Sequence, residues 1–262
     1  MTSRLGAMTW PEVSDGALLV IPTGSCEQHG PHLPLDTDTR IAVALANELA
    51  RRIDGILVGP AVAIGASGEH QAFPGTLSIG TTVFEAVVVE LCRSALPPAY
   101  SGNPAPFAGV VFVNGHGGNI EAFSSALNVL HGEGRRVLAW HPRVVGGDSH
   151  AGRTETSMLL HLDPDCVRED LIEPGSTARW RDIGATVMAE GLAAVTPNGI
   201  LGDPTTATAA KGSEVFETLV DDLCSVVGAW LSTNGLALPE IPTALSTISE
   251  ADRSRSDTAD DA

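Results

Sequence analysis

Hydrophobic residues occur in two kinds of stretch that alternate along the chain. Short apolar runs end in glycine-rich or polar segments, and the longer stretches between them carry apolar residues at helical spacing, as Ile41, Leu45 and Leu49 do. A short apolar run is typical of a strand buried on both faces, and an amphipathic stretch is typical of a helix that covers a sheet. The alternation predicts an α/β fold, a single domain with a mostly parallel central sheet flanked by helices.

The pattern also gives the expected element boundaries. The predicted strands cover residues 17–21, 56–62, 110–113 and 137–140, and the predicted helices cover residues 37–52, 82–96, 120–133, 153–162 and 212–230. Residues 97–107 include four prolines, which cannot continue a helix and predict a surface loop. The last segment is rich in Ser, Thr, Asp and Ala, so we expect one domain over residues 1–238 and a disordered acidic tail over residues 239–262.

Composition limits the classes of partner. With 262 residues, of which 43% are hydrophobic, the chain can bury one sizeable core. The formal net charge of −17 repels phosphate backbones and anionic lipids, so neither nucleic acid nor a membrane is an expected partner. The longest apolar runs are much shorter than the roughly 20 residues of a transmembrane helix. Residues 1–10 lack the features of a secretory signal, which favours a cytoplasmic location.

Three polar segments follow predicted strands or open predicted helices. They cover residues 27–38, 114–119 and 148–157. In open α/β sheets the reactive loops lie beyond the carboxyl ends of the strands. We therefore expect the three segments to meet in one pocket.

The first segment offers a mixed set of metal ligands. Glu27 and His29 are two residues apart, so in an extended backbone both side chains leave the same face. Asp38 lies at the start of a predicted helix, where an acidic residue is also favoured by the helix dipole alone. Carboxylate and imidazole together suit Zn²⁺, Fe²⁺ or Mn²⁺.

The other two segments add candidates with competing structural explanations. His116 lies among glycines that allow close backbone approach to a ligand, although a glycine-rich phosphate cradle is an alternative; the lysine of a P-loop is missing. Gly117 and Gly118 can offer backbone N–H groups to an oxyanion. His150 and Glu155 are candidates too, but an ordinary loop histidine and a first-turn acid explain them equally well.

A further loop and one cysteine complete the candidates. Ser67, Glu69 and His70 lie on a conformationally demanding loop and are expected to line a substrate pocket, unless loop rigidity alone explains them. Of four scattered cysteines, Cys26 adjoins Glu27 and is an alternative nucleophile, as in thiol amidases.

Together these segments resemble the creatininase family, α/β hydrolases with a two-metal centre that act on linear or cyclic amides. The resemblance rests on residues 27–38, 73–76, 114–119 and 150–157. It implies that Glu27 and His116 bind one divalent metal ion, that His29 binds a second, and that Asp38 bridges them. It also implies that His150 is the catalytic histidine.

Two positions depart from the pattern of creatinine-hydrolysing members. Those members carry a Tyr and a metal-binding Glu where this chain has Gly117 and Gly118. The difference argues against creatinine as substrate and leaves a ligand position that we expect Glu155 to fill. Gln28, His32 and Asp36 are expected to orient the ligands through hydrogen bonds.

A narrower resemblance, at residues 35–40, 65–71 and 197–210, is to the peptidases of this family that act in mycofactocin biosynthesis. It implies a ribosomally made precursor peptide as substrate, from which a C-terminal Val-Tyr dipeptide, modified by a radical enzyme, is released. Family resemblance also implies a homo-oligomer. The alternatives are another amidohydrolase of the family, such as a deformylase or cyclic-amide hydrolase, and a metal-binding subunit without catalytic activity.

Overall fold

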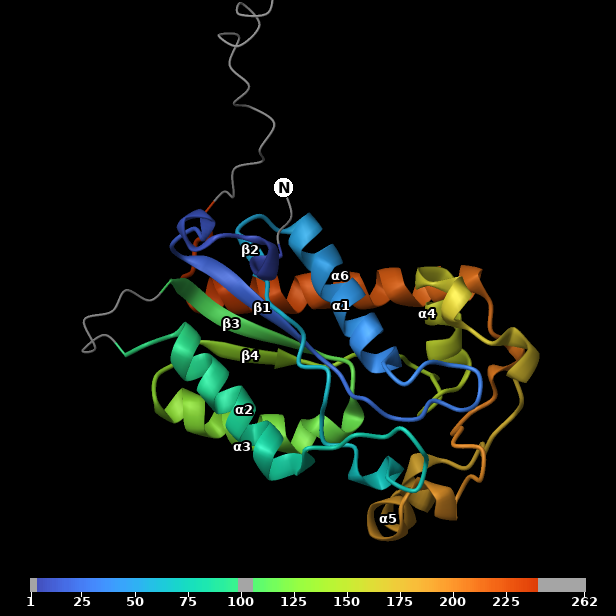
Figure 1. Ribbon diagram of the computed structural model, residues 1–262. Helices are drawn as coiled ribbons and strands as arrows, with labels where there is room; N and C mark the ends of the chain where they lie inside the picture. The colour runs from blue at the N-terminus through green and yellow to red at the C-terminus, as the bar shows by residue number, and fades with distance from the viewer. Residues whose placement is uncertain (1–3, 99–105, 240–262) are drawn as a thin grey trace, which may run out of the picture.

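Four parallel strands form the centre of the molecule in the order β2-β1-β3-β4 (Figure 1). The structure is a computed structural model that describes residues 4–98 and 106–239. The strands are β1 (Ala17–Thr23), β2 (Ile56–Val58), β3 (Phe107–Asn114) and β4 (Val137–Trp140). All side chains of β1 are buried, as expected for a central strand with neighbours on both sides.

Helices cover both faces of this sheet (Figure 1). On one face α1 (Thr37–Arg52), α4 (Arg153–Leu162) and α6 (Ala209–Thr233) enclose a core that includes Leu18 and Val20. On the other face α2 (Gly80–Ala95) and α3 (Ile120–Gly132) enclose a core that includes Leu19 and Ile21. Successive residues of β1 therefore enter opposite cores, because side chains of a strand alternate between its two faces.

The predicted α/β architecture is confirmed, with several differences in boundaries. The predicted strand 56–62 ends at Val58, because Gly59 and Pro60 follow and proline has no N–H for a strand ladder. The helix α6 begins three residues before its predicted start and ends three residues after its predicted end. The expected loop lies mostly at residues 99–105 and the expected tail mostly at residues 240–262, and both segments are outside the described residues.

One helix was not predicted from the sequence. The helix α5 (Trp180–Glu190) buries only Gly184 and Val187, so its apolar periodicity is weak. It lies beside the sheet layers rather than on them (Figure 1). Its Val187 packs with Leu192 and Leu201 in a small separate core. Within the described ranges, no helix combines the length and apolar character needed to cross a bilayer.

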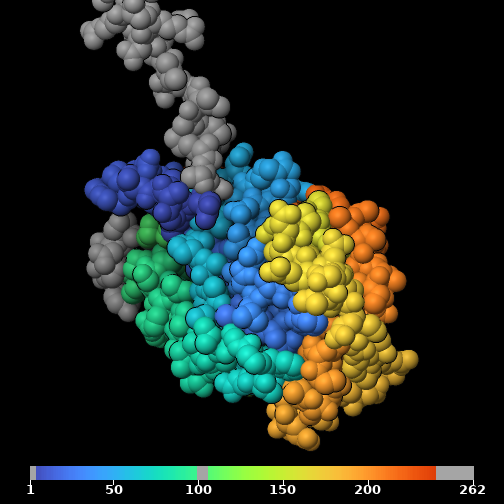
Figure 2. Space-filling view, turned by 45° about the vertical axis from the view of Figure 1, so that its right-hand side comes forward, coloured from blue at the N-terminus to red at the C-terminus, as the bar shows by residue number. Residues whose placement is uncertain are grey.

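Segments far apart in sequence meet at one face of the molecule. Figure 2 shows the blue chain of the first 50 residues bordered by cyan segments on one side and by yellow and orange segments of the second half on the other. Because all strands run parallel, their carboxyl ends lie at the same edge of the sheet, and the connecting loops gather there. The polar segments predicted to converge are among these loops.

The helices α4 and α6 approach each other closely at Gly212. A Cβ atom at Gly212 would overlap the carbonyl oxygen of Ser157 in α4, so the two helices touch through backbone atoms. Gly228, in the same helix α6, has no atom within 4 Å of its Cβ position.

We expect Gly212→Ala to lower the free energy of unfolding by about 1–3 kcal/mol, since an added methyl group must push α4 and α6 apart. The matched control Gly228→Ala should raise stability by about 0.5–1 kcal/mol, because alanine is the better helix former and the position is open. Urea denaturation of both variants measures the difference. Equal stabilities for the two variants would contradict this account of the helix contact.

Candidate metal centre

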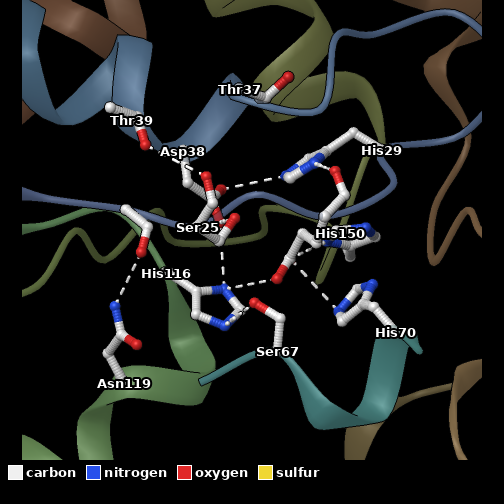
Figure 3. A network of polar contacts seen from close by, with 12 residues as sticks. Ser25, His29, Thr37, Asp38, Thr39, Ser67, His70, His116, Asn119 and His150 are labelled. Carbon is white, nitrogen blue, oxygen red and sulfur yellow. Dashed lines mark hydrogen bonds and ion pairs between the residues drawn. The ribbon is translucent and has the colours of Figure 1, made fainter. Parts of the chain in front are cut away.

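The loops after β1 and β3 and the first turn of α1 bring His29, His116 and Asp38 together, with His150 beside them (Figure 3). The first turn of α4 adds a further candidate ligand. Glu27 and His29 follow β1, and Asp38 lies in the first turn of α1. His116 follows β3, and Glu155 lies in the first turn of α4. The expected convergence of three sequence segments is therefore confirmed.

Asp38 lies between two histidines. Its Oδ1 is 3.1 Å from Nε2 of His29, and its Oδ2 is 3.0 Å from Nδ1 of His116. The hydroxyl of Ser25 donates a hydrogen bond to Oδ2 at 2.8 Å. The side chain is almost completely buried. A carboxylate whose two oxygens face two separate imidazoles has the arrangement that a bridging metal ligand needs.

Glu27 is a buried carboxylate without a hydrogen bond. Its Oε1 lies 3.3 Å from Nε2 of His70 and its Oε2 lies 3.3 Å from Nδ1 of His116, but neither contact has hydrogen-bond geometry. A buried charge without hydrogen bonds is costly unless a cation compensates it. Glu27 therefore fits a metal ion better than it fits its protein surroundings alone.

Three imidazoles are oriented by backbone carbonyl groups. The outer nitrogen of each lies within hydrogen-bond distance of a carbonyl oxygen: His116 Nε2 is 3.0 Å from Ala66, His29 Nδ1 is 3.2 Å from Glu27, and His150 Nε2 is 2.8 Å from Gln28. In the neutral form of each ring the outer N–H can donate to its carbonyl group, and the other nitrogen then faces the carboxylates with a free lone pair. Metal-binding histidines are usually held in this way.

The ligand atoms form three overlapping groups within which all atoms lie within 4.8 Å of one another: Glu27 with Asp38 and His116, His29 with His150 and Glu155, and Glu27 with His70 and His150. Ligand atoms about 2.0–2.2 Å from a tetrahedral ion are separated from one another by about 3.3 Å. The distances around Asp38 match that separation, and the oxygen and nitrogen donors suit divalent zinc, iron or manganese.

The electrostatics of the cluster favour positive charge. Burial opposes protonation of His29, but the carboxylates of Asp38, Glu155 and Glu27 outweigh burial and raise its pKa to about 10. Burial raises the pKa of Glu155 to about 7, because a buried carboxylate is disfavoured in its charged form. His150 differs, since burial and the nearby His29 lower its pKa well below the usual value. A divalent cation would replace the protons that the carboxylates attract.

The segment before α4 is held in an unusual conformation. Backbone hydrogen bonds between His150 and Leu201 tie it to a loop about 50 residues later in the chain. Among the residues that the structure describes, Ala151 alone has a positive φ without being a glycine, at 51°. Its N–H donates to Oε2 of Glu155 at 2.6 Å. Such strain is tolerated where the surroundings fix the backbone, often at a functional site.

The three residues expected to orient ligands lie in different surroundings. The Gln28 amide is within 3.0 Å of Nδ1 of His70, to which it can donate. His32 is buried and its Nε2 is 2.8 Å from the hydroxyl of Thr156, beside Glu155. Asp36 instead pairs with Arg40 and its side chain is 48% exposed. The prediction for Asp36 is wrong in that no candidate ligand contacts it, because its position before α1 directs the carboxylate to Arg40.

A cavity of about 220 Å³ opens beside the ligands and includes Asp38, His116, His150 and Glu155 in its wall. Of the residues expected to bind substrate, Gly117 lines this cavity, whereas Ser67, Glu69, His70 and Gly118 do not. Ser67 is buried and its hydroxyl lies 3.3 Å from Nε2 of His116, so it contacts a candidate ligand instead. His141 lines the cavity and was not predicted, because its sequence neighbours carry no ligand pattern.

Gly118 occupies the position of the metal-binding Glu in the creatinine-hydrolysing pattern, and packing requires a glycine there. A Cβ atom at Gly118 would overlap the carbonyl oxygen of Ala66 and lie 2.5 Å from Nε2 of His116. It would also lie 2.9 Å from Oε1 of Glu69. Gly117, one position earlier, has no atom within 4 Å of its Cβ position. The space for a metal-binding side chain at residue 118 is therefore absent.

The Cys26 thiol is directed away from the cavity. Its Sγ can donate to the carbonyl oxygen of Gly75 at 3.7 Å, and Cys26 is not among the residues that line the 220 Å³ cavity. This placement gives no support to a cysteine nucleophile.

Solved structures show which fold this centre belongs to. A creatininase described as the Mn form matches with a TM-score of 0.70 and 25% identity, covering 87% of this chain and 98% of that chain. A variant creatininase of Zn-Zn type matches with a TM-score of 0.69 and 26% identity over the same shares of both chains. The metals named for these structures have the donor preferences found in this cluster.

Sequence comparison gives the same assignment. Residues 6–227 match the family model described as creatinine amidohydrolase. The mycofactocin precursor peptide peptidase of Mycobacterium ulcerans (strain Agy99) is 46% identical over 87% of this chain and 89% of its own length. The creatinine amidohydrolase of Pseudomonas putida is 28% identical over 85% of this chain and 95% of its own length. The chain therefore belongs to the creatininase family.

Proposed function

We propose that this protein is a metal-dependent peptidase that releases the modified C-terminal Val-Tyr dipeptide from the mycofactocin precursor peptide. The observation that carries the proposal is the 46% identity, over most of both chains, to relatives named mycofactocin precursor peptide peptidase. The packing at Gly118 supports it, because it separates this site from the creatinine-hydrolysing pattern.

Two divalent ions, Zn²⁺, Fe²⁺ or Mn²⁺, would be held by the clustered side chains. Glu27 and His116 would bind one ion, His29 and Glu155 the other, and Asp38 both; the separate contacts of the two Asp38 oxygens support this division. When bound, such ions supply the Lewis acidity that activates a water molecule and polarises an amide carbonyl.

The protein side chains would orient the reactants and move the proton. His150 presents an unprotonated Nδ1 to the centre, 3.8 Å from Oε1 of Glu27, because its Nε2–H is directed to the Gln28 carbonyl. We assign to this nitrogen the removal of a proton from the attacking water molecule and the delivery of that proton to the leaving amine. Gly117 leaves its part of the cavity free of side-chain atoms, which suits a substrate as bulky as a peptide.

One alternative activity has support of its own. A deformylase of Methanothermobacter thermautotrophicus is 32% identical over 145 residues, 55% of this chain. The shorter match makes deformylation the second candidate. A metal-binding subunit without catalytic activity is disfavoured, because His150 is in place in the cavity wall.

For the chain as a whole we propose one hydrolase domain over residues 1–238. The family assignment supports a homo-oligomer, and sequence composition is the basis for proposing a cytoplasmic protein that binds neither nucleic acid nor membranes.

The activity can be tested with the purified protein and the radical-enzyme-modified precursor peptide. We expect mass spectrometry to detect the released dipeptide, chelation of divalent metals to abolish release, and thiol alkylation to have no effect. A formylated amine serves as the competing substrate. Full activity in a metal-free preparation, or preference for the formylated amine, would overturn the peptidase proposal.

Substitutions at Asp38 and His150 should separate metal binding from proton transfer. Asp38→Ala is expected to lower metal content and activity together, because both ions lose a shared ligand. His150→Ala is expected to keep both ions and lower kcat by about 10²–10⁴-fold. Elemental analysis alongside turnover measures both quantities. Loss of one ion in His150→Ala would show that His150 is a metal ligand. The position of His150 is compatible with that role, because its ring nitrogens lie within 4.8 Å of carboxylate oxygens of Glu27 and Glu155.

The neighbouring glycines provide a matched pair. We expect Gly118→Ala to weaken metal binding by about 10–100-fold, because the added methyl group displaces His116. Gly117→Ala, with open space at its Cβ position, should retain the metal affinity of the unmodified protein. Titration of the metal-free proteins with Zn²⁺ measures the two affinities. Equal affinities would contradict the packing argument.

A further inference from the structure

His141 lies beside the metal centre and has no role in the proposed mechanism. It is the first residue after β4, and it lines the 220 Å³ cavity together with Asp38, His116 and Glu155. Its half-buried ring packs edge to face against Phe123, with ring centroids 5.6 Å apart. The side chain is therefore held in place in the wall of the cavity that receives the substrate.

The orientation of the neighbouring Asn114 amide is fixed by its hydrogen bonds. Its Oδ1 lies 3.1 Å from the hydroxyl of Thr23, 3.0 Å from Nδ2 of Asn119 and 3.3 Å from the backbone nitrogen of His116, which all donate. Its Nδ2 lies 2.6 Å from the carbonyl oxygen of His116 and 2.9 Å from Nδ1 of His141. An amide NH₂ group has two hydrogens, and these two acceptors use both.

This arrangement determines the tautomer of His141. Because Nδ1 accepts a hydrogen bond from Asn114, it carries a lone pair, and a neutral imidazole then has its proton on Nε2. Burial, with a smaller contribution from Arg143, lowers the pKa of His141 and keeps the ring neutral. His141 therefore presents one N–H donor at Nε2.

That donor has no partner within the described part of the chain. The structure shows no hydrogen bond to Nε2 of His141, and the atom is not among the buried unpartnered ones, so it is accessible to solvent in a residue that lines the cavity. The charged groups of the same wall, Asp38, Asp148 and Glu155, are hydrogen-bond acceptors when ionised. A peptide substrate brings carbonyl oxygens into the cavity, and these require donors.

We propose that His141 is a substrate-binding residue whose Nε2–H donates a hydrogen bond to a backbone carbonyl oxygen of the peptide, next to the bond that is cleaved. The inference rests on the proposed peptidase function and adds to it a fixed contact that positions the peptide in the cavity. The competing explanation is structural: His141 would serve only to accept the hydrogen bond of Asn114 and so hold His116.

Two substitutions separate these roles, since each keeps one nitrogen position of the ring. His141→Asn can place its amide oxygen near the position of Nδ1 and accept from Asn114, but it has no donor at the position of Nε2. His141→Gln can place an amide N–H near the position of Nε2. We expect His141→Asn to retain its metals and lose about tenfold or more in kcat/KM, mainly through a higher KM. We expect His141→Gln to recover most of that loss.

The measurements are steady-state kinetics on the modified precursor peptide, metal content and unfolding midpoints for the holoenzyme and both variants. Unchanged kcat/KM in His141→Asn would overturn the inference. A larger loss of kcat/KM in His141→Gln than in His141→Asn would also overturn it. So would a loss of activity in proportion to a loss of bound metal.

The activity of the unmodified protein distinguishes failure of the His141 proposal from failure of the proposed peptidase function. If it cleaves the peptide and the His141 variants do so equally well, only the role of His141 is wrong. If it cleaves a different amide, the peptidase proposal is wrong and the same variants are compared on that amide, whose carbonyl oxygen needs the same donor. A protein that cleaves no amide would overturn both proposals.

Discussion

Two carboxylates, Glu27 and Asp38, lie buried side by side at the carboxyl edge of the sheet, and this negative charge constrains everything around it. The nitrogens of His29, His70 and His116 approach the carboxylate oxygens to between 3.0 and 3.3 Å. Backbone carbonyls in turn hold the far nitrogens of His29 and His116. The loops at this edge therefore have little freedom, because a shifted loop would leave a buried charge without compensation.

Sequence pattern was sufficient to locate the sheet and to predict that most of the candidate ligands lie close together. Apolar runs located all four strands, since a strand buried on both faces has no polar positions. Glu27, His29 and Asp38 could be grouped because they share one short segment. His116 and Glu155 could be added because parallel strands bring their following loops to the same edge.

What the sequence did not show depends on contacts between distant residues. The orientation of His141 depends on the amide of Asn114, 27 residues earlier and at the end of β3, so no local pattern marks it. Ser67 was expected to meet substrate, yet it is buried against His116, and only the folded loop determines which way its hydroxyl points. Asp36 was misassigned for the opposite reason, since a local i,i+4 pair with Arg40 accounts for it.

The backbone pairing between His150 and Leu201 divides the candidate site into two groups of residues, which come from different segments of the chain. Glu27, Asp38 and His116 all lie within residues 27–116, whereas His150 is fixed by backbone hydrogen bonds to Leu201. The candidate ligands of the first group therefore come from one continuous 90-residue stretch, whereas the cavity is complete only with the loop at Leu201. A circular permutant opened between residues 116 and 150 would keep the first group of candidate ligands on one segment and bring His150 and Leu201 together on the other.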